Sequence, residues 1–357
     1  MEIGSIIELN TEKLFSLSAG KKEIVFPFMK NTFYNLKHFN TGRSAIEALF
    51  NYLHQQRGVD NVFVPCFICS SVIDALKRSK VKITPYKVNK DLTFDIKNIS
   101  CGQNDVIYAC EYFGKGFTQE VLSTIKGLQN KGVTVVQDIT LNLLANGESF
   151  IFGDYIIGSE RKWFAIPDGG FIASKSELPD FKIVDEINDY TLYYLVAQLM
   201  KSEYLKNANL DKNEYLNYYK KATECLFSDY TVRSISKISE NLLKQTDFDF
   251  IAKKRIENYD FLFNAFSKFD FIRPLERESD SVPMGMVVMT NERDSLFKYL
   301  VANDVYCNIH WRENNLISLY EDSKYVSETV LTIPCDQRYG IDDLNRVVEL
   351  IKSYKRQ

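Results

Sequence analysis

The sequence alternates short apolar runs with amphipathic helical stretches through its first half. The runs are rich in β-branched residues and lie at residues 61–64, 105–110, 133–136, 155–157 and 170–173. Residues 71–80 and 118–131, which lie between them, follow a helical period. Strands that are apolar on both faces are typical of a parallel sheet buried between layers of helices. The pattern therefore predicts an α/β fold with a large, mostly parallel mixed sheet between helices.

The remainder of the chain has a different pattern. Residues 185–244 are helical in period and rich in tyrosine, and another long helical stretch follows residue 247. Three further strands are expected at 286–289, 305–310 and 329–333, before a last helix over 341–354. We interpret residues 1–240 as a large domain that includes the N-terminal segment, and residues 241–357 as a smaller C-terminal α+β domain. No repeat and no linker rich in proline, glycine or serine separates them, which indicates a rigid connection.

Composition narrows the class of protein. The 44 basic and 47 acidic residues give a net charge of −3, which argues against a nucleic-acid-binding protein. No apolar stretch approaches the roughly 20 residues of a membrane helix, and no signal peptide is expected. The seven scattered cysteines indicate a reducing cytoplasm, and packing explains the pair Cys66 and Cys69 better than a metal site does.

Two polar residues follow predicted strands. Asp138 ends the run at 133–136, and Lys162 lies 24 residues later, after the run at 155–157. Ligands of open α/β sheets bind beyond the carboxyl ends of the strands. A lysine and a carboxylate there are what a pyridoxal phosphate (PLP) enzyme needs, because the lysine captures the aldehyde and the carboxylate keeps the pyridine nitrogen protonated. A solvated lysine and an Asx turn at the aspartate are the alternative interpretations.

A third element precedes both residues. Gly42 permits close backbone approach, and Ser44 with Glu47 has the spacing of a capping box that opens a helix running to about Arg57. Free N–H groups and the helix dipole at such a start favour an anion, and Arg43 adds a candidate guanidinium contact. An ordinary capped helix is the commoner explanation of such a motif alone. Its place ahead of Asp138 makes it a candidate phosphate site.

The residues around the lysine support the same chemistry. The hydroxyl of Ser159, three residues before Lys162, can bind the phosphate of the group that the lysine captures. Arg161 is a candidate cation that lowers the pKa of the amine, although it can equally point to solvent. The apolar pair after the lysine and the glycine-rich turn at 167–170 argue against a plain surface lysine.

These motifs together resemble the DegT/DnrJ family of sugar aminotransferases, a branch of the fold-type-I PLP enzymes, over almost the whole chain. The matching segments are 41–46 (phosphate loop), 64–69 (proline-led loop with the ring-stacking residue), 111–114 (Glu-Tyr-Phe-Gly, similar to the family's His-Tyr-Phe-Gly turn), 137–138 (Gln-Asp, similar to its Glu-Asp), 159–163 and 168–170 (serine, Schiff-base lysine and glycines), and 309–311 with 331–334 (small-domain strands). Their common order makes the resemblance more specific than any single motif.

The resemblance implies an aminotransferase that uses pyridoxal 5'-phosphate. It would move an amino group from an amino acid, expected to be glutamate, to a nucleotide-linked keto-sugar, for cell-surface polysaccharide or amino-sugar biosynthesis. Lys162 and Asp138 would be catalytic, and Lys162 would also act as general base. The expected cofactor-binding residues are Gly42, Arg43, Ser44, Cys69, Asp138, Ser159 and Lys162. Tyr112 and His310 are candidate substrate residues, although a lone histidine on a strand is more often structural.

A homodimer is also implied, because fold-type-I sites usually take residues from both subunits. The tyrosine-rich stretch at 190–194 is a candidate contact region, and packing within one chain explains it equally well. The sequence offers no spacing typical of a metal site.

Three departures from the family pattern leave an alternative open. Leu141 stands where the family carries histidine or glutamine, with Asn142 as a possible replacement; Cys69 stands where an aromatic residue is common; and Arg43 replaces threonine. The alternative is a catalytically altered PLP-fold protein that acts as a sugar-nucleotide binding or scaffold subunit. Retention of Lys162 and Asp138 speaks against it, and also against a keto-sugar dehydratase, since that branch of the family typically replaces the lysine.

Overall fold

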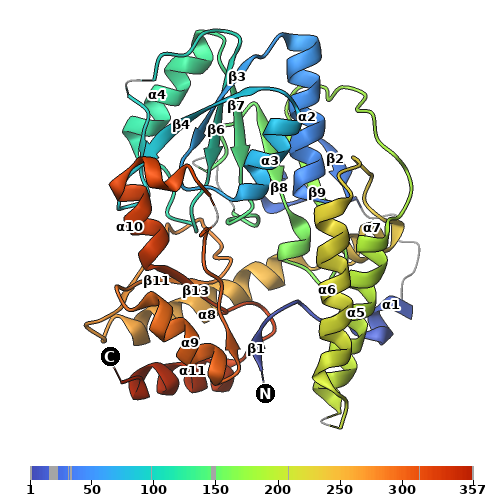
Figure 1. Cartoon of the computed structure of the whole chain (residues 1–357), viewed down its shortest axis with the longest axis vertical. Coiled ribbons are helices and arrows are strands. Elements are labelled where there is room, and N and C mark those ends of the chain that lie inside the picture. The colour runs from blue at the N-terminus through green and yellow to red at the C-terminus, as the bar shows by residue number, and fades with distance from the viewer. Residues whose placement is uncertain are drawn as a thin grey trace.

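The computed structural model describes residues 2–15, 23–30, 32, 34–97, 99–145, 150–207, 209–312 and 314–355. Its largest element is an eight-stranded sheet (Figure 1). The strands of this sheet, in chain order, are β2 (Asn35–Phe39), β3 (Asn61–Pro65), β4 (Lys82–Val88), β5 (Phe94–Asp95), β6 (Asp105–Cys110), β7 (Thr134–Asp138), β8 (Tyr155–Gly158) and β9 (Gly170–Ser174). Their spatial order is β2-β9-β8-β7-β6-β3-β4-β5.

The sheet is mixed and mostly parallel, as expected. Strands β8, β7, β6, β3 and β4 run parallel to their neighbours in this row. Strand β9 is antiparallel to both β2 and β8, and β5 is antiparallel to β4. Because the parallel strands share one direction, the carboxyl ends of β7 and β8 lie at the same edge. That edge carries the residues that follow Asp138 and Gly158.

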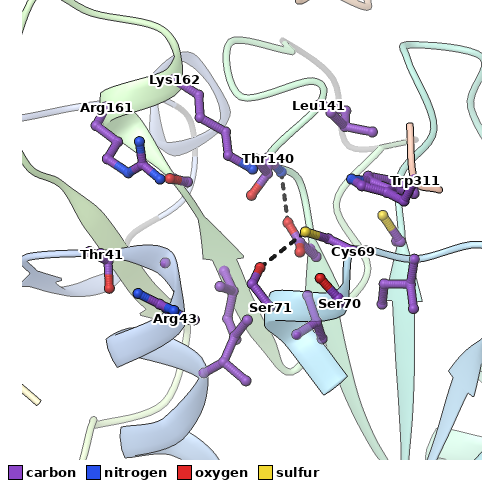
Figure 2. Close-up of a pocket in the computed structure, with 18 of the residues that line it drawn as sticks. Thr41, Arg43, Cys69, Ser70, Ser71, Thr140, Leu141, Arg161, Lys162 and Trp311 are labelled. Carbon is purple, nitrogen blue, oxygen red and sulfur yellow. Dashed lines mark hydrogen bonds between the residues drawn. The ribbon is translucent and has the colours of Figure 1, made fainter. Parts of the chain in front are cut away.

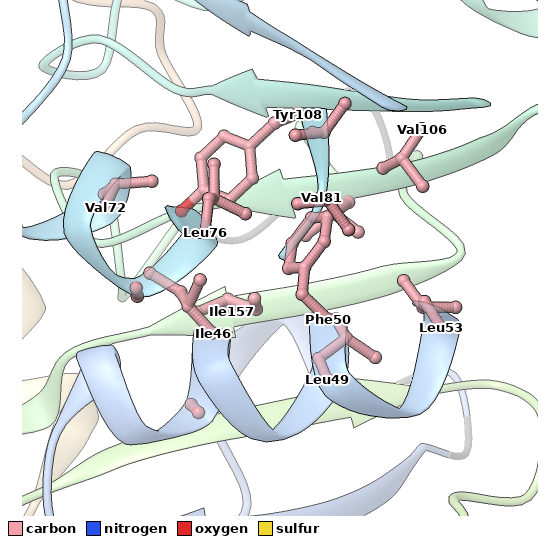
Figure 3. Close-up of a cluster of buried hydrophobic side chains, with 14 of the residues drawn as sticks. Ile46, Leu49, Phe50, Leu53, Val72, Leu76, Val81, Val106, Tyr108 and Ile157 are labelled. Carbon is pink, nitrogen blue, oxygen red and sulfur yellow. The ribbon is translucent and has the colours of Figure 1, made fainter. Parts of the chain in front are cut away.

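Helices cover both faces of this sheet (Figure 1). One face packs against α2 (Gly42–Arg57) and α3 (Ser70–Arg78), and the other packs against α4 (Gln119–Asn130). Successive residues of β6 show the two faces, because Tyr108 belongs to the first cluster and Ile107 to the second. Figure 3 shows the first cluster, in which Leu49 and Phe50 of α2 lie against the sheet. These two residues of β6 and these two residues of α2 are all fully buried, so the sheet is covered on both faces.

The helical segment forms three helices, α5 (Asp189–Lys206), α6 (Lys212–Ser228) and α7 (Lys237–Lys244). Helices α5 and α6 lie side by side as a hairpin, and buried tyrosines fill the space between them. Tyr190 and Tyr194 of α5 are among these buried residues, so part of the stretch expected at a subunit contact packs within its own chain.

The C-terminal part contains a small antiparallel sheet and its helices. Its elements are α8 (Phe248–Phe266), β10 (Arg273–Pro274), β11 (Met286–Met289), α9 (Arg293–Ala302), β12 (Val305–Tyr306), η3 (Ile317–Leu319), α10 (Glu321–Thr329), β13 (Val330–Ile333) and α11 (Ile341–Ser353). Strands β10, β11 and β13 pair in that order. The strand expected over 305–310 is only two residues long in β12, so that prediction was wrong in length.

The N-terminal segment joins this C-terminal part. It contains β1 (Ile3–Gly4), α1 (Thr11–Phe15) and the short helix η1 (Pro27–Met29). Strand β1 pairs in parallel with β12, and Ile3 is fully buried in the same cluster as Val305 and Leu331. The first residues therefore pack with the C-terminal part of the chain.

The boundary at residue 240 stays a prediction. It falls within α7, whose Leu242 and Leu243 still pack beneath the large sheet. Helix α8 contributes Phe248 to that same cluster and Leu262 to the core of the small sheet. One continuous helix thus shares its two ends between the two cores, which explains why no linker was found. Within the described residues, no helix is both long and apolar enough to span a bilayer.

Replacing Gly170 with alanine should destabilise the protein, because a Cβ at this position would lie 2.3 Å from the backbone nitrogen of Gly42. We expect a loss of at least about 2 kcal/mol in the free energy of unfolding, measured with urea, since backbone on both sides has to move. Gly127→Ala in α4 is the matched control, because nothing lies within 4 Å of its Cβ. The control should gain about 0.5–1 kcal/mol, as a helical alanine does. Equal stability of the two variants would contradict the close contact.

Candidate active site

Helix α2 begins at Gly42, two residues before Ser44, where the expected capping box would begin. Thr41 is the N-cap, with extended backbone, and its Oγ1 accepts the N–H of Ser44 at 3.1 Å. The Ser44 hydroxyl donates to Oδ1 of Asn40 at 2.6 Å, and the Glu47 carboxylate accepts from Arg78 at 2.7 Å. The box of Ser44 and Glu47 was therefore wrong, because a threonine three residues earlier already caps the helix. The N–H groups of the first helical residues have no intrahelical acceptor.

A glycine turn holds this helix start in place. The N–H of Gly169 donates to the carbonyl of Asn40 at 2.7 Å, and Gly169 has a φ of +149° that favours glycine. A Cβ on Gly42 would lie 3.2 Å from the Cβ of Ser159, so these two residues are in close contact. The segments around residues 41, 159 and 169 therefore meet at one point.

Asp168, the first residue of that turn, is buried and accepts hydrogen bonds from three groups. These are the N–H of Ser236 at 3.0 Å, the hydroxyl of Ser236 at 2.8 Å and the hydroxyl of Thr191 at 3.2 Å. Burial raises the pKa of Asp168 to about 6 despite these bonds. The carboxyl group thus ties the glycine turn to α5 and α7.

Asp138 is the last residue of β7 and is fixed by two donors. The hydroxyl of Tyr108 donates to Oδ2 at 2.7 Å, and the N–H of Thr140 donates to Oδ1 at 2.9 Å. Only 6% of Asp138 is exposed. A carboxylate offers about four acceptor positions, so each oxygen keeps capacity for one more donor.

Lys162 is the last residue of the short helix η2 (Glu160–Lys162), and the next residue, Trp163, anchors the end of this helix. The Trp163 ring is fully buried, and its Nε1–H donates to the carbonyl of Thr140 at 2.7 Å. Thr140 thereby touches both the base of the lysine turn and the carboxylate of Asp138. Among the described residues, none forms a hydrogen bond or ion pair with the Lys162 ammonium group.

Asp138 and Lys162 line one cavity of about 210 Å³. Figure 2 shows the Lys162 side chain extending across this cavity toward Thr140. Thr41, Arg43 and Arg161 lie along one side of it, and Cys69, Leu141 and Trp311 lie along the other. We call it the inner chamber. Six of the seven residues expected at the cofactor line it, namely Gly42, Arg43, Cys69, Asp138, Ser159 and Lys162.

Ser44 is the seventh, and it does not line the inner chamber. Its amide and its hydroxyl are engaged by Thr41 and Asn40, one turn into the helix. Arg43 lines the chamber but its guanidinium donates to the carbonyl of Leu226 and stacks on the rings of Phe227 and Tyr230, each 5.4 Å away. The side chain of Arg43 is therefore directed toward the end of α6.

A second cavity of about 500 Å³ adjoins the first, and we call it the outer chamber. The two share Leu141, Arg161, Lys162 and Trp311 in their walls. Residues 4–7 of the N-terminal segment form part of the outer chamber, held by the buried Lys201, whose ammonium group donates to the carbonyls of Gly4 at 3.0 Å and Ile6 at 2.8 Å. Lys162 thus stands at the junction of two spaces.

The two candidate substrate residues have different positions. His310 lines the outer chamber, where its Nε2 contacts the hydroxyl of Thr332 at 3.0 Å. Tyr112 lines neither chamber; only 3% of it is exposed and its hydroxyl donates to the carbonyl of Phe67. The structure thus places Tyr112 in the core, because the aromatic cluster around Phe67 and Phe94 encloses its ring.

Three contributors were not foreseen from the sequence. Tyr108 and Thr140 fix Asp138, and the N-terminal segment closes the outer chamber. Asn142, a possible replacement for the family residue at Leu141, faces away: its Oδ1 accepts the N–H of Val282 at 2.9 Å and only 1% of it is exposed. A signal for Tyr108 existed in the alternation of β6, which puts its ring on the α2 face.

Comparison with known proteins gives a fold but no close relative. No protein-family model and no curated protein sequence matches the chain. Among solved structures, the Streptococcus pneumoniae protein Spr1654 in its PLP form is 13% identical, with 99% of this chain and 98% of that chain covered and a TM-score of 0.67. PseC from Helicobacter pylori, an aminotransferase of pseudoaminic acid biosynthesis, is also 13% identical. The match covers 99% of this chain and 98% of that chain, with a TM-score of 0.67.

The sugar aminotransferase CalS13 from Micromonospora echinospora is similar at 15% identity, with 99% of both chains covered and a TM-score of 0.62. Likeness over almost the full length of all three proteins shows that the chain has the fold-type-I architecture expected from its sequence. At these identities the likeness establishes the fold and leaves the chemistry to be argued from the site.

His310→Gln should weaken the acid sensitivity of the fold. Burial and the neighbouring Lys162 charge lower the pKa of His310 to about 3 from an ordinary 6.5. The unfolded chain therefore binds a proton that the folded chain does not, so stability is complete above the ordinary pKa and falls as the pH drops toward 3. Glutamine should reduce the slope of unfolding free energy against pH by up to about 1.4 kcal/mol per pH unit between these limits.

The measurement is urea unfolding at a series of pH values, with His54→Gln as the control for losing an imidazole. An unchanged slope in His310→Gln would show that this imidazole is not kept neutral by its surroundings.

Proposed function

We propose that this protein is a PLP-dependent aminotransferase acting on a nucleotide-linked keto-sugar, with an amino acid, expected to be glutamate, as donor. The observation that carries the proposal is the shared inner chamber: Lys162 extends into it from η2, and Asp138 lines it at the end of β7. The start of α2 supplies a third wall through Gly42.

The residues present fit the cofactor. Among the described residues nothing pairs with the amino group of Lys162, which can therefore meet an aldehyde, and Asp138 has acceptor capacity left for a pyridine N–H. The start of α2 lines the chamber through Gly42 and Arg43, and the close contact of Gly42 with Ser159 would not admit a larger residue without a shift. When bound, PLP supplies an electron sink for the electrons released at the carbon that loses or gains the amino group.

Lys162 Nζ is the proposed general base. It stands at the junction of the two chambers, beside the space proposed for the substrates. As a free amine it would accept the proton from the α-carbon of the amino donor and hold it as the ammonium form until it is returned to the bound substrate. Trp163 and its bond to Thr140 keep the lysine turn at a fixed distance from the Asp138 strand end, which limits misalignment.

The outer chamber is the proposed place of the substrates. Its volume of about 500 Å³ is within the usual range of roughly 300–1,000 Å³ for small-molecule sites. Leu141 and Trp311 lie between the two chambers and supply apolar surface that would exclude water from the reacting atoms. His310 lines the same chamber as a neutral imidazole, since its pKa is lowered to about 3. It remains a candidate substrate contact.

The neighbours support this reaction class. Spr1654 is known in a PLP form, and PseC and CalS13 are named as aminotransferases, the first of pseudoaminic acid biosynthesis and the second of sugars. A homodimer in the cytoplasm, and a role in polysaccharide or amino-sugar biosynthesis, belong to the same proposal. Phe227, 57% exposed although it lines the inner chamber, favours a partner subunit at this rim.

A binding or scaffold protein is the second candidate. It is favoured by Leu141 and Cys69, which place an aliphatic chain and a thiol where the family carries cofactor-contacting residues. Either function requires the outer chamber, so only the chemistry of Lys162 separates them.

Lys162→Ala should abolish lysine-linked cofactor binding. The wild-type protein mixed with PLP should develop a visible absorption band that survives gel filtration and is trapped by borohydride on Lys162, as located by mass spectrometry. The variant should show neither. Lys126→Ala, on the exposed face of α4, is the matched control and should behave as wild type. Trapping on another lysine, or equal colour in Lys162→Ala, would contradict the assignment.

Asp138→Asn should separate cofactor capture from chemistry. The isosteric amide still accepts from Tyr108 or Thr140, so the coloured complex should form. Loss of the colour on adding glutamate should slow by roughly 100-fold or more, because the negative charge opposite the pyridine nitrogen is gone. Stopped-flow absorbance measures this half-reaction without a sugar substrate. A wild-type complex that forms but never responds to any amino donor would favour the scaffold protein.

A further inference from the structure

The guanidinium expected at the phosphate is directed elsewhere. Arg43 follows Gly42 in α2, yet its side chain donates to the carbonyl of Leu226 and stacks on Phe227 and Tyr230. The bond to Leu226 uses one of the five guanidinium N–H donors, and the two rings hold the guanidinium group beside α6. The sequence pattern favours Arg43 as the phosphate contact. Because the Arg43 side chain is directed toward α6, another cation on the wall of the inner chamber is the better candidate for this contact.

Arg161 is that cation. It lies in η2 between Ser159 and Lys162, and it lines both chambers. Its guanidinium faces the ring of Tyr190 at 5.7 Å and the hydroxyl of Tyr194. Within the part of the chain that the structure describes, no carboxylate forms an ion pair with it, and its buried Nε has no acceptor.

The neighbouring carboxylate does not serve Arg161. Glu160 is fully buried; its Oε1 lies 2.9 Å from Nδ1 of His38, and among the described residues it forms no ion pair with Arg161. Arg161 as a whole is half-buried, but its Nε is buried, and a buried donor without an acceptor is costly. Arg161 is thus a positive group on the wall of both chambers that no carboxylate of the described residues neutralises.

The position of Arg161 shows which anion would compensate it. Figure 2 shows Arg161 on the same side of the inner chamber as Thr41 and Arg43, with Lys162 reaching away from that side. Burial and the nearby guanidinium groups of Arg161 and Arg78 lower the pKa of Arg43, which agrees with a short distance between Arg43 and Arg161. Ser159, two residues before Arg161, touches Gly42 at the helix start.

We infer that Arg161 binds the phosphate of the cofactor, together with the N–H groups at the start of α2 and the hydroxyl of Ser159. Arg43 contributes its backbone N–H and uses its side chain to fasten the end of α6 over the chamber. The ligand class is a phosphate monoester dianion, for which a guanidinium and a helix start are complementary. This inference rests on the proposed function, because it names the group that holds the phosphate of the same cofactor.

The test compares PLP with pyridoxal, which carries the same aldehyde without the phosphate. Equilibrium constants for both are measured by absorbance titration of the full-length apoprotein, and the ratio of the two constants isolates the phosphate contribution. Arg161→Gln should lower the preference for PLP over pyridoxal by roughly 10- to 100-fold, as expected for losing one charge-assisted contact. Arg161→Lys should restore part of it, since a point charge replaces the fork.

Arg78→Gln is the matched control. It removes a guanidinium that also lies near Arg43 but lines neither chamber, being paired with Glu47 at 2.7 Å. Its PLP preference should change by less than about fivefold. A second readout uses inorganic phosphate, which should raise the thermal unfolding midpoint of the wild-type apoprotein more than that of Arg161→Gln. This measurement also shows whether the variant folds.

Two outcomes would overturn the inference alone. In the first, Arg161→Gln keeps the wild-type preference while the wild type forms its lysine-linked complex. In the second, Arg43→Gln lowers the preference and Arg161→Gln does not. A wild-type protein that binds neither PLP nor pyridoxal through Lys162 would end both the inference and the proposed function. Because the wild type alone decides that last case, the two failures are distinguishable.

Discussion

The site depends on one close backbone contact between the start of α2 and the glycine turn at 168–170. Gly170 lies so near the backbone of Thr41 and Gly42 that no side chain fits between them, and Gly169 donates to Asn40 from the other side. This contact brings a helix start from the beginning of the chain against the turn that follows the lysine. The distance between Gly42 and Lys162 is therefore set by main chain on main chain, which is the stiffest contact that a fold can provide.

A second fixed path joins the lysine to the aspartate. Trp163 is bonded to the carbonyl of Thr140, and the amide of Thr140 is bonded to Asp138, which Tyr108 holds from behind. The two chemical groups thus stand at opposite ends of a short chain of hydrogen bonds inside a buried cluster. Such an arrangement holds two groups at a set separation before any ligand arrives, which is where much of the rate of an enzyme originates.

Much of the fold could be predicted because its strands are apolar on both faces. The runs at 105–110 and 286–289 match β6 and β11 to the residue. Strand β2 was missed because Lys37 and His38 interrupt its apolar pattern at the edge of the sheet, and β4 was missed because Pro85 and its lysines read as a loop. The true cap at Thr41 was missed because local spacing alone does not distinguish two hydroxyls three residues apart.

The residues of the site also fall into two groups, those that could be predicted from the order of the strands and those that depend on distant parts of the chain. Lys162, Asp138 and Ser159 follow strands in sequence, so their shared edge could be predicted from topology. The direction of the Arg43 side chain could not, because it is decided by α6, nearly 200 residues away in the chain. Likewise Tyr112 was assigned by its place in a motif, whereas its burial comes from neighbours on β5 and the loop after β3.

The pairing of β1 with β12 bears on the order of folding. Ile3 and Val305 are 302 positions apart, yet they occupy one core. Closing so long a loop costs conformational entropy. The stabilising contacts between β1 and β12 form only after the intervening sheet has brought the two strands together. During synthesis the first residues must therefore wait, unpaired, until most of the polypeptide has left the ribosome. The outer chamber, which those residues help to enclose, would be the last part of the molecule to take shape.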